Sequence, residues 1–322
     1  MDRDRRVDPR ADLKLKRALV LTVALAVAVF VALAFYSDFG LFDQLGSFRW
    51  ELFPLALALT AVNYLIRFGR WEIYLRRVGI EVPTGRSFAV FVAGLTMTIT
   101  PGKAGEVLKC GLLRRSFEVP VRRSAPVVLA ERVTDATGVV VLAVIAGAST
   151  DRWPLLVLAL AGVAAIVFVV HSPLLGRFAA LGEAPVAARQ LLGAWLLVTM
   201  TALSAVSWFF ECLAAYVCVR GLDLDLSLAD TVVVFSVGSL AGALSFLPGG
   251  LGVAEASMTG LIRHLGDTTK VAAAAATVLI RLATLWFAVA LGLIGLTVEE
   301  RLARAEGDGH RVVARDGSRR RR

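Results

Sequence analysis

The chain has 322 residues, of which 57% are hydrophobic, and its mean hydropathy is +0.71. A soluble globular domain is roughly 45–50% apolar, so this composition excludes an ordinary soluble domain and indicates that lipid is the main solvent. The formal net charge of +9 does not indicate a nucleic-acid partner, because the basic residues stand beside long apolar runs and not on polar faces between short amphipathic elements. The three cysteines lack CxxC and metal-ligand spacing, so we expect them to pack among apolar side chains, and we expect no metal or other cofactor.

Six apolar runs are long enough to form transmembrane helices, since a ~30 Å hydrocarbon core requires about 20 mostly apolar residues. The first run follows a strongly basic segment, residues 1–17. It is too long for the core of a cleaved signal peptide, so we interpret it as a retained transmembrane helix. The six predicted spans are residues 18–36, 52–75, 125–149, 153–172, 191–219 and 271–298.

Two shorter apolar stretches, 87–100 and 228–247, each run into a Pro-Gly break. Proline removes a backbone donor and glycine weakens a helix, so each break should end one helical half and begin another near the middle of the membrane. Backbone groups freed at that depth are tolerated only inside protein or beside a polar cavity. We therefore predict two re-entrant hairpins; the alternative is a simple kink in an ordinary membrane helix. The break residues are Pro101, Gly102 and Gly105 in the first stretch and Pro248, Gly249, Gly250 and Gly252 in the second.

The distribution of Lys and Arg supports this topology, because short loops rich in positive charge stay in the cytoplasm. If both hairpins return to the side from which they enter, the cytoplasmic segments hold 28 of the 35 Lys and Arg residues. Both termini are then cytoplasmic. Residues 18–298 form the predicted membrane domain, between the basic N-terminus at 1–17 and a basic tail at 299–322 that we predict to be disordered.

The same topology makes the two halves of the membrane domain inverted with respect to each other. Each half, about residues 52–149 and 191–298, contains a long helix, a broken hairpin and another long helix. Inverted repeats with discontinuous helices point to the binding site of a transporter. The predicted fold class is all-α: a polytopic integral membrane protein with about six transmembrane helices plus two re-entrant broken-helix hairpins in an inverted repeat.

Charged residues embedded in these helices are the candidate site. An unpaired charge at the bilayer centre costs about 2.5–3.5 kcal/mol, so such residues usually pair or line a wet cavity. The half-helix after each break also directs unpaired N–H groups and a positive dipole end inward, where an anion is stabilised. The candidate head-group cations are Arg67, Arg70, Lys103, Lys109, Arg132 and Arg281. The candidates for charge pairing or proton coupling are Glu106, Glu131, Asp135 and Glu255.

Two structural alternatives stay open for these charges. Glu131, Arg132 and Asp135 could form structural ion pairs at the cytoplasmic boundary, and Arg67 and Arg70 could be a positive-inside anchor. A further carboxylate, that of Glu211, falls in an apolar run and receives no specific role.

As a set and in this order, the embedded charges and break residues make the chain resemble the flippase-like proteins of the lysylphosphatidylglycerol synthase transmembrane-region family. In that family, the membrane region of a bifunctional synthase is associated with movement of lysyl-phosphatidylglycerol between leaflets, while a large cytoplasmic domain transfers the aminoacyl group. This chain ends about 20 residues after its last predicted helix, so we expect the transport half without the synthase domain. The residues that carry the resemblance are Arg67, Arg70, Trp71, Pro101, Gly102, Lys103, Gly105, Glu106, Lys109, Glu131, Arg132, Asp135, Pro248, Gly249, Gly250, Leu251, Gly252, Glu255 and Arg281.

The sequence therefore predicts a membrane protein, not an enzyme, that binds a lipid with an anionic or zwitterionic head group and translocates it by alternating access. The resemblance implies a cell (cytoplasmic) membrane, and the expected partners are membrane lipids, either phospholipid or polyprenyl-linked, with a lipid-modifying enzyme as a further candidate. Two other classes stay open. One is a non-transporting scaffold for a lipid-modifying or glycosyl-transferring partner, and the other is a membrane enzyme that acts on lipid head groups with Glu131 or Asp135 as general base.

Overall fold

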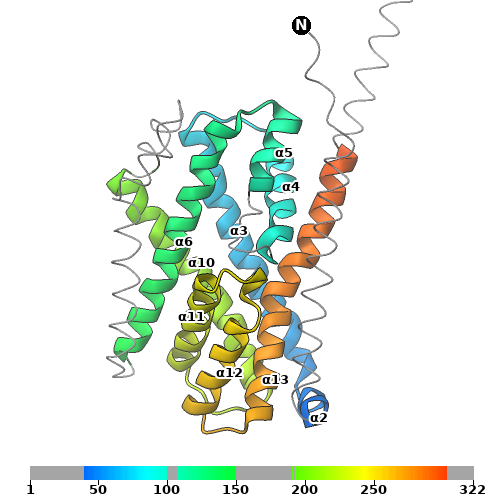
Figure 1. Ribbon diagram of the computed structural model, residues 1–322, viewed down its shortest axis with the longest axis vertical. Helices are drawn as coiled ribbons and strands as arrows, with labels where there is room; N and C mark the ends of the chain where they lie inside the picture. The colour runs from blue at the N-terminus through cyan, green and yellow to red at the C-terminus, as the bar shows by residue number, and fades with distance from the viewer. Residues whose placement is uncertain (1–39, 100–106, 150–190, 192, 303–322) are drawn as a thin grey trace, which may run out of the picture.

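The computed structural model describes residues 40–99, 107–149, 191 and 193–302 (Figure 1). All regular elements in these ranges are helical, as the sequence predicts. The predicted runs 18–36 and 153–172 lie outside the described residues. The elements are α2 (Gly40–Gly46), η1 (Trp50–Leu52), α3 (Phe53–Arg77), α4 (Thr84–Leu95), η2 (Thr96–Ile99), α5 (Val107–Phe117), α6 (Val121–Ser149), α10 (Ala194–Gly221), α11 (Leu228–Leu244), η4 (Pro248–Gly250), α12 (Val253–Leu265), α13 (Lys270–Arg281) and the π-helical turn η5 (Leu282–Trp286), after which the helix continues to Leu302.

Three helices in the described ranges are long and apolar enough to cross a membrane by length and composition. They coincide with the predicted runs 52–75, 191–219 and 271–298, and α6 covers the predicted run 125–149 as one continuous helix. Helices of this length and hydropathy are typical of membrane spans, so the chain is a helical membrane protein. The three helices are Trp50–Arg77, Ala194–Gly221 and Lys270–Leu302.

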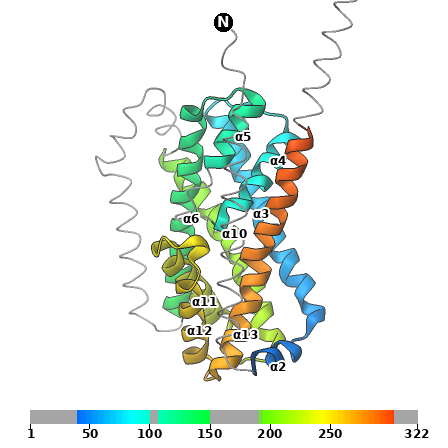
Figure 2. The same ribbon diagram turned by 45° about the vertical axis from the view of Figure 1, so that its right-hand side comes forward.

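Two other apolar segments, Thr84–Ile99 and Leu228–Leu244, are shorter helices. In Figures 1 and 2, α4 and α5 lie in one half of the molecule and α11 and α12 in the other, whereas α3, α6, α10 and the long helix that begins with α13 extend along most of its length. Helix α4 packs against α5, and α11 packs against α12. The turns η2 and η4 are in contact, so the two short-helix pairs meet in the interior.

Side-chain caps define where the helices of the second half begin. At the start of α11, the Ser227 hydroxyl accepts a hydrogen bond from the backbone N–H of Asp230 at 3.0 Å. At the start of α12, the Glu255 carboxylate accepts one from the backbone N–H of Gly252 at 2.6 Å. Both contacts satisfy amide donors that the first helical turn leaves without a partner. The sequence therefore restarts a helix directly after the second Pro-Gly break.

The chain between α11 and α12 leaves the α-helical conformation at the positions where the sequence predicts a break. Gly249, Gly250 and Gly252 have φ angles of 61°, 67° and 85°, a region that favours glycine. A Cβ atom at Gly250 would lie only 2.7 Å from the Cα atom of Gly242 in α11. Glycine at position 250 thus allows both the turn and the close approach of the loop to the helix.

The buried apolar side chains form two main cores. One core is built mainly from α10 to α13 and includes Cys212, Met258 and Ile280. The other is built mainly from α3, α4 and α5 and includes Trp71 and Phe91. A smaller cluster lies where the two short-helix pairs meet and consists of Ile99, Leu251, Leu285 and Val289.

Candidate functional site

A cavity of about 320 Å³ is lined by members of both cores and by the loop between α11 and α12. Most of its wall is apolar. Its charged lining residues are contributed by α3, α6, α10 and α13, and they are Arg67, Arg132, Asp135, Glu211 and Arg281. The described lining residues thus include three arginines and two carboxylates, which gives the lining a formal net charge of +1.

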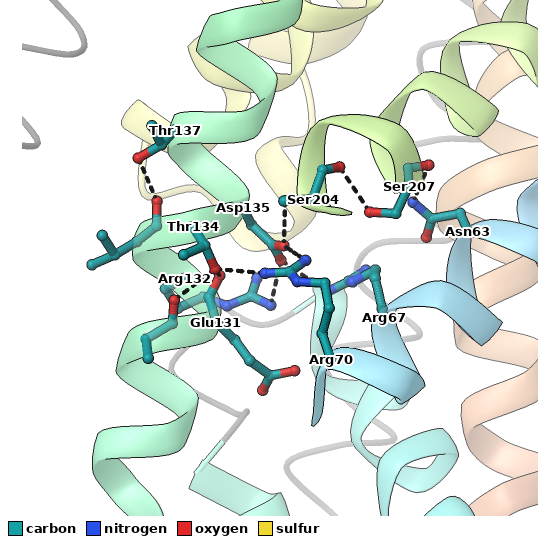
Figure 3. A network of polar contacts seen from close by, with 12 residues as sticks. Asn63, Arg67, Arg70, Glu131, Arg132, Thr134, Asp135, Thr137, Ser204 and Ser207 are labelled. Carbon is teal, nitrogen blue, oxygen red and sulfur yellow. Dashed lines mark hydrogen bonds and ion pairs between the residues drawn. The ribbon is translucent and has the colours of Figure 1, made fainter. Parts of the chain in front are cut away.

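Asp135 of α6 is the centre of a buried ion network (Figure 3). Its Oδ1 atom accepts hydrogen bonds from Arg70 Nη1 at 2.6 Å and from Ser204 Oγ at 3.0 Å. Its Oδ2 atom lies 2.9 Å from Arg132 Nη2 and 3.3 Å from Arg67 Nη2. Charge-assisted bonds of this kind replace the water that a buried carboxylate loses. The network therefore joins α3, α6 and α10.

The three arginines of this network have different surroundings. Arg70 is the most deeply held, since its Nη2 atom also donates to Thr134 Oγ1 at 2.5 Å, and it does not line the cavity. Arg67 lines the cavity and lies over the ring of Trp208, 5.8 Å from the centroid, a favourable position for a cation. Arg132 also lines the cavity. Two of the three guanidinium groups are thus placed to contact a ligand.

A glycine allows α6 and α10 to approach closely enough for this network. A Cβ atom at Gly138 would lie 2.8 Å from both Ala205 N and Ser204 Oγ. The approach brings Ser204 within reach of Asp135. The neighbouring turn of α10 is held to α3 by Asn63, whose Nδ2 atom donates to the carbonyl oxygen of Ser207 at 2.7 Å (Figure 3).

Arg281, at the end of α13, forms a second network on the loop between α11 and α12. Its Nε atom lies 2.6 Å from Glu255 Oε1, and its Nη2 atom donates to the carbonyl oxygen of Gly249 at 2.6 Å. The other oxygen of Glu255 caps α12 at Gly252. The π-helical turn η5 directly follows Arg281, and such turns are frequent at functional sites. Arg281 therefore holds the broken segment in place and lines the cavity with the same side chain.

Lys109 and Glu131 form a third, separate ion pair. The Lys109 Nζ atom lies 3.0 Å from Glu131 Oε2, and both side chains are buried. The ammonium group also lies 4.7 Å from the ring centroid of Trp71 and 4.9 Å from that of Phe91, which stabilises a cation. Neither member of the pair lines the cavity. The pair therefore joins α5 to α6.

The structure thus divides the predicted site residues by position. Of the predicted cations, Arg67, Arg132 and Arg281 line the cavity, whereas Arg70 and Lys109 do not. Among the predicted carboxylates, Asp135 lines the cavity, Glu255 pairs with Arg281, and Glu131 pairs with Lys109. Of the second break, Gly249 and Gly250 line the cavity. The predicted site residues of the first break and its neighbours lie outside the described ranges, and they are Pro101, Gly102, Lys103, Gly105 and Glu106.

The cavity residues that received no role from the sequence include Tyr64, Trp208 and Glu211, which carry polar groups. Trp208 and Glu211 are three residues apart on α10 and so share one face of the helix. The available signal was the carboxylate of Glu211 inside an otherwise apolar helix, since such a group usually faces the protein interior. Its spacing from Trp208 could then have placed the indole beside it.

Comparison with known proteins assigns the family. The model of the family described as Lysylphosphatidylglycerol synthase TM region matches residues 18–292. The chain belongs to this family. The resemblance inferred from the embedded charges and the break residues is therefore confirmed.

Two curated relatives, both named UPF0104 membrane protein, come from Methanothermobacter thermautotrophicus. One match has 25% identity over 298 residues and covers 77% of this chain and 87% of the relative. The other has 37% identity over 92 residues and covers 29% of this chain and 27% of the relative. The chain is thus similar to membrane proteins along most of its length, and the family model concerns the membrane region of the synthase.

Proposed function

We propose that the protein binds a lipid with an anionic or zwitterionic head group in the cavity and moves it between the leaflets of the cell membrane. The observation that carries this proposal is the convergence of Arg67, Arg132 and Arg281, from three different helices, on one largely apolar cavity. Guanidinium groups bind phosphate oxygens through paired charge-assisted hydrogen bonds. The net positive lining favours an anion where water cannot screen it.

The arrangement of the helices supports a transport mechanism. We propose six crossings and two re-entrant hairpins, with residues 18–298 as the membrane domain and both basic termini in the cytoplasm. The pairs α4/α5 and α11/α12 would be the hairpins of two inverted repeats, about residues 52–149 and 191–298. Their placement in opposite halves of the molecule, with η2 and η4 in contact beside the cavity, is the support for this assignment. In such folds one repeat rocks against the other around a central site.

A head-group phosphate would compete with carboxylates for the lining arginines. Arg281 is the arginine best placed to exchange partners, because its contacts are one carboxylate and one loop carbonyl. When phosphate takes this guanidinium, Glu255 keeps the N–H of Gly252, and the loop loses its tie to α13. Asp135 keeps Arg70 and Ser204 when Arg67 and Arg132 turn to the ligand.

The test is exchange of labelled phosphatidylglycerol between the leaflets of proteoliposomes. The double variant Arg281→Gln with Glu255→Gln removes the cavity pair without leaving a buried charge alone, and we expect it to abolish exchange. The matched control is Arg86→Gln with Glu299→Gln, a buried pair 3.4 Å apart that does not line the cavity. We expect this control to exchange lipid like the parent protein.

Two results would reject the proposal. Exchange that persists in the folded Arg281/Glu255 variant, or that falls equally in both double variants, would remove the cavity from the mechanism. Exchange by the parent protein no faster than in empty liposomes would reject transport and favour the scaffold hypothesis.

A further inference from the structure

The cavity wall combines guanidinium groups with aliphatic side chains from the end of α11. The lining arginines belong to α3, α6 and α13, whereas Leu240, Ala243 and Leu247 line the same cavity from the last turns of α11 and the loop that follows. Leu240 also packs beside Val140 and Ala143 of α6. A ligand in this cavity would therefore meet both guanidinium groups and aliphatic side chains.

The apolar wall continues onto the outer surface at the tip formed by residues 244–253. Leu247 lines the cavity and is also 45% exposed at the molecular surface. Its neighbours Leu244, Phe246 and Val253 are 76%, 72% and 36% exposed. In Figures 1 and 2 this tip lies part-way along the molecule and not at either end. In a membrane protein, we expect an apolar surface at such a position to contact lipid chains.

The backbone of the tip is also unusual. Phe246 has a φ angle of 54°, which aromatic residues rarely adopt and which persists only where the surrounding structure imposes it. Non-helical backbone at membrane depth is tolerated when it borders protein or a cavity, and Leu247, Gly249 and Gly250 do line one. The tip therefore has the features of an opening between the cavity and the surrounding lipid.

We infer that the tip at residues 244–253 is the acyl-chain site of the lipid whose head group occupies the cavity. This inference rests on the proposed function. The head group lies at Arg132 and Arg281, and the chains pass over Ala243 and Leu247 to the surface of Leu244 and Phe246. Leu247 belongs both to the cavity wall and to this exposed surface, so the two are continuous. Other exposed apolar side chains of the described helices, such as Val198 and Ile294, do not line the cavity.

The test places a photoreactive amino acid, p-benzoylphenylalanine, at position 246 in one protein and at position 198 in a control protein. Val198 is 64% exposed, so we expect both probes to contact lipid. The vesicles contain equal amounts of phosphatidylglycerol and an uncharged glycolipid with the same acyl chains. At position 246 we expect phosphatidylglycerol adducts to exceed glycolipid adducts about tenfold, since a charge-assisted contact distinguishes the head groups. At position 198 we expect the adducts to follow the composition of the bilayer.

The Arg281→Gln with Glu255→Gln variant links the tip to the cavity. In this variant we expect the enrichment at position 246 to disappear while the yield at position 198 stays unchanged. Equal enrichment at both positions, or enrichment that survives the double variant, would overturn the inference. The adducts at position 246 could instead follow the composition of the bilayer while leaflet exchange still depends on Arg281. That result would overturn the acyl-chain site and leave the proposed function standing. If exchange is independent of Arg281 as well, both fail.

Discussion

The two arginine networks on the cavity differ in what they connect. Asp135 joins three continuous helices, α3, α6 and α10, and it holds three guanidinium groups and a hydroxyl. Arg281 joins a continuous helix to a broken one, and it holds one carboxylate and one loop carbonyl. The first network has excess donors around a single acceptor group, and the second has one cation shared between two acceptors.

From this difference we infer a structural role for the Asp135 network and, under the proposed function, a switching role for the Arg281 network. Removal of one donor from Asp135 leaves others in place, so that network can release an arginine to a ligand and still hold the helices. Removal of the guanidinium from the loop leaves Gly249 without this hydrogen bond and Glu255 without its cation. Under the proposed function, a ligand that binds Arg281 would release the α11–α12 loop from α13, whereas a ligand that binds Arg67 or Arg132 would leave Asp135 with Arg70 and Ser204.

The largest expected effect is on the structural network. Asp135→Asn leaves buried arginines without their carboxylate, so we expect the free energy of unfolding in detergent to fall by about 3–5 kcal/mol. The control is Arg76→Gln, which breaks a 3.7 Å pair between an exposed arginine and Glu72. Because the arginine is exposed to solvent, stability should change by about 0–1 kcal/mol. A loss for Asp135→Asn no greater than that of the control would show that the network is not a structural anchor.

A smaller loss is expected at the loop. Gly250→Ala places a Cβ atom against Gly242 and imposes a positive φ on alanine, so we expect a loss of about 1–3 kcal/mol and a lower melting temperature. Gly260 of α12 is the matched control, because a Cβ atom there meets nothing within 4 Å. Gly260→Ala should raise stability by about 0.5–1 kcal/mol, since alanine is favoured in a helix. Equal effects at the two positions would contradict the close approach of the loop to α11.

The smallest effect is expected at the pair outside the cavity. Replacement of both members by apolar residues, Lys109→Met with Glu131→Leu, removes two charges that satisfy each other, so we expect stability to change by about 1 kcal/mol or less. Leaflet exchange of phosphatidylglycerol in proteoliposomes should stay at the level of the parent protein. Loss of exchange in the folded double variant would return Lys109 to the head-group site that the sequence predicted for it.

The sequence identified most charged residues that meet at the cavity, but it did not separate their roles. Arg67, Arg70 and Lys109 look equivalent as cations beside apolar runs, and yet Arg67 alone of the three lines the cavity. Tryptophan and tyrosine in an apolar helix carry no signal of their own, so Trp208 and Tyr64 were not assigned to the site. Ion-pair partners are chosen by contacts between helices, and those contacts join residues that are far apart in the chain.

By itself, the sequence determined that lipid surrounds the protein and that the fold is helical. It also determined the approximate ends of the long helices and the position of the second break. These properties depend on local composition: apolar length decides whether a helix can span a bilayer, and Pro-Gly decides where it stops. Only the tertiary structure decided that Arg281 holds the Gly249 carbonyl and that Asp135 holds three arginines. The physical reason is that these contacts require helices to approach within hydrogen-bond distance, and that approach depends on the packing of positions such as Gly138 against a helix that is distant in the sequence.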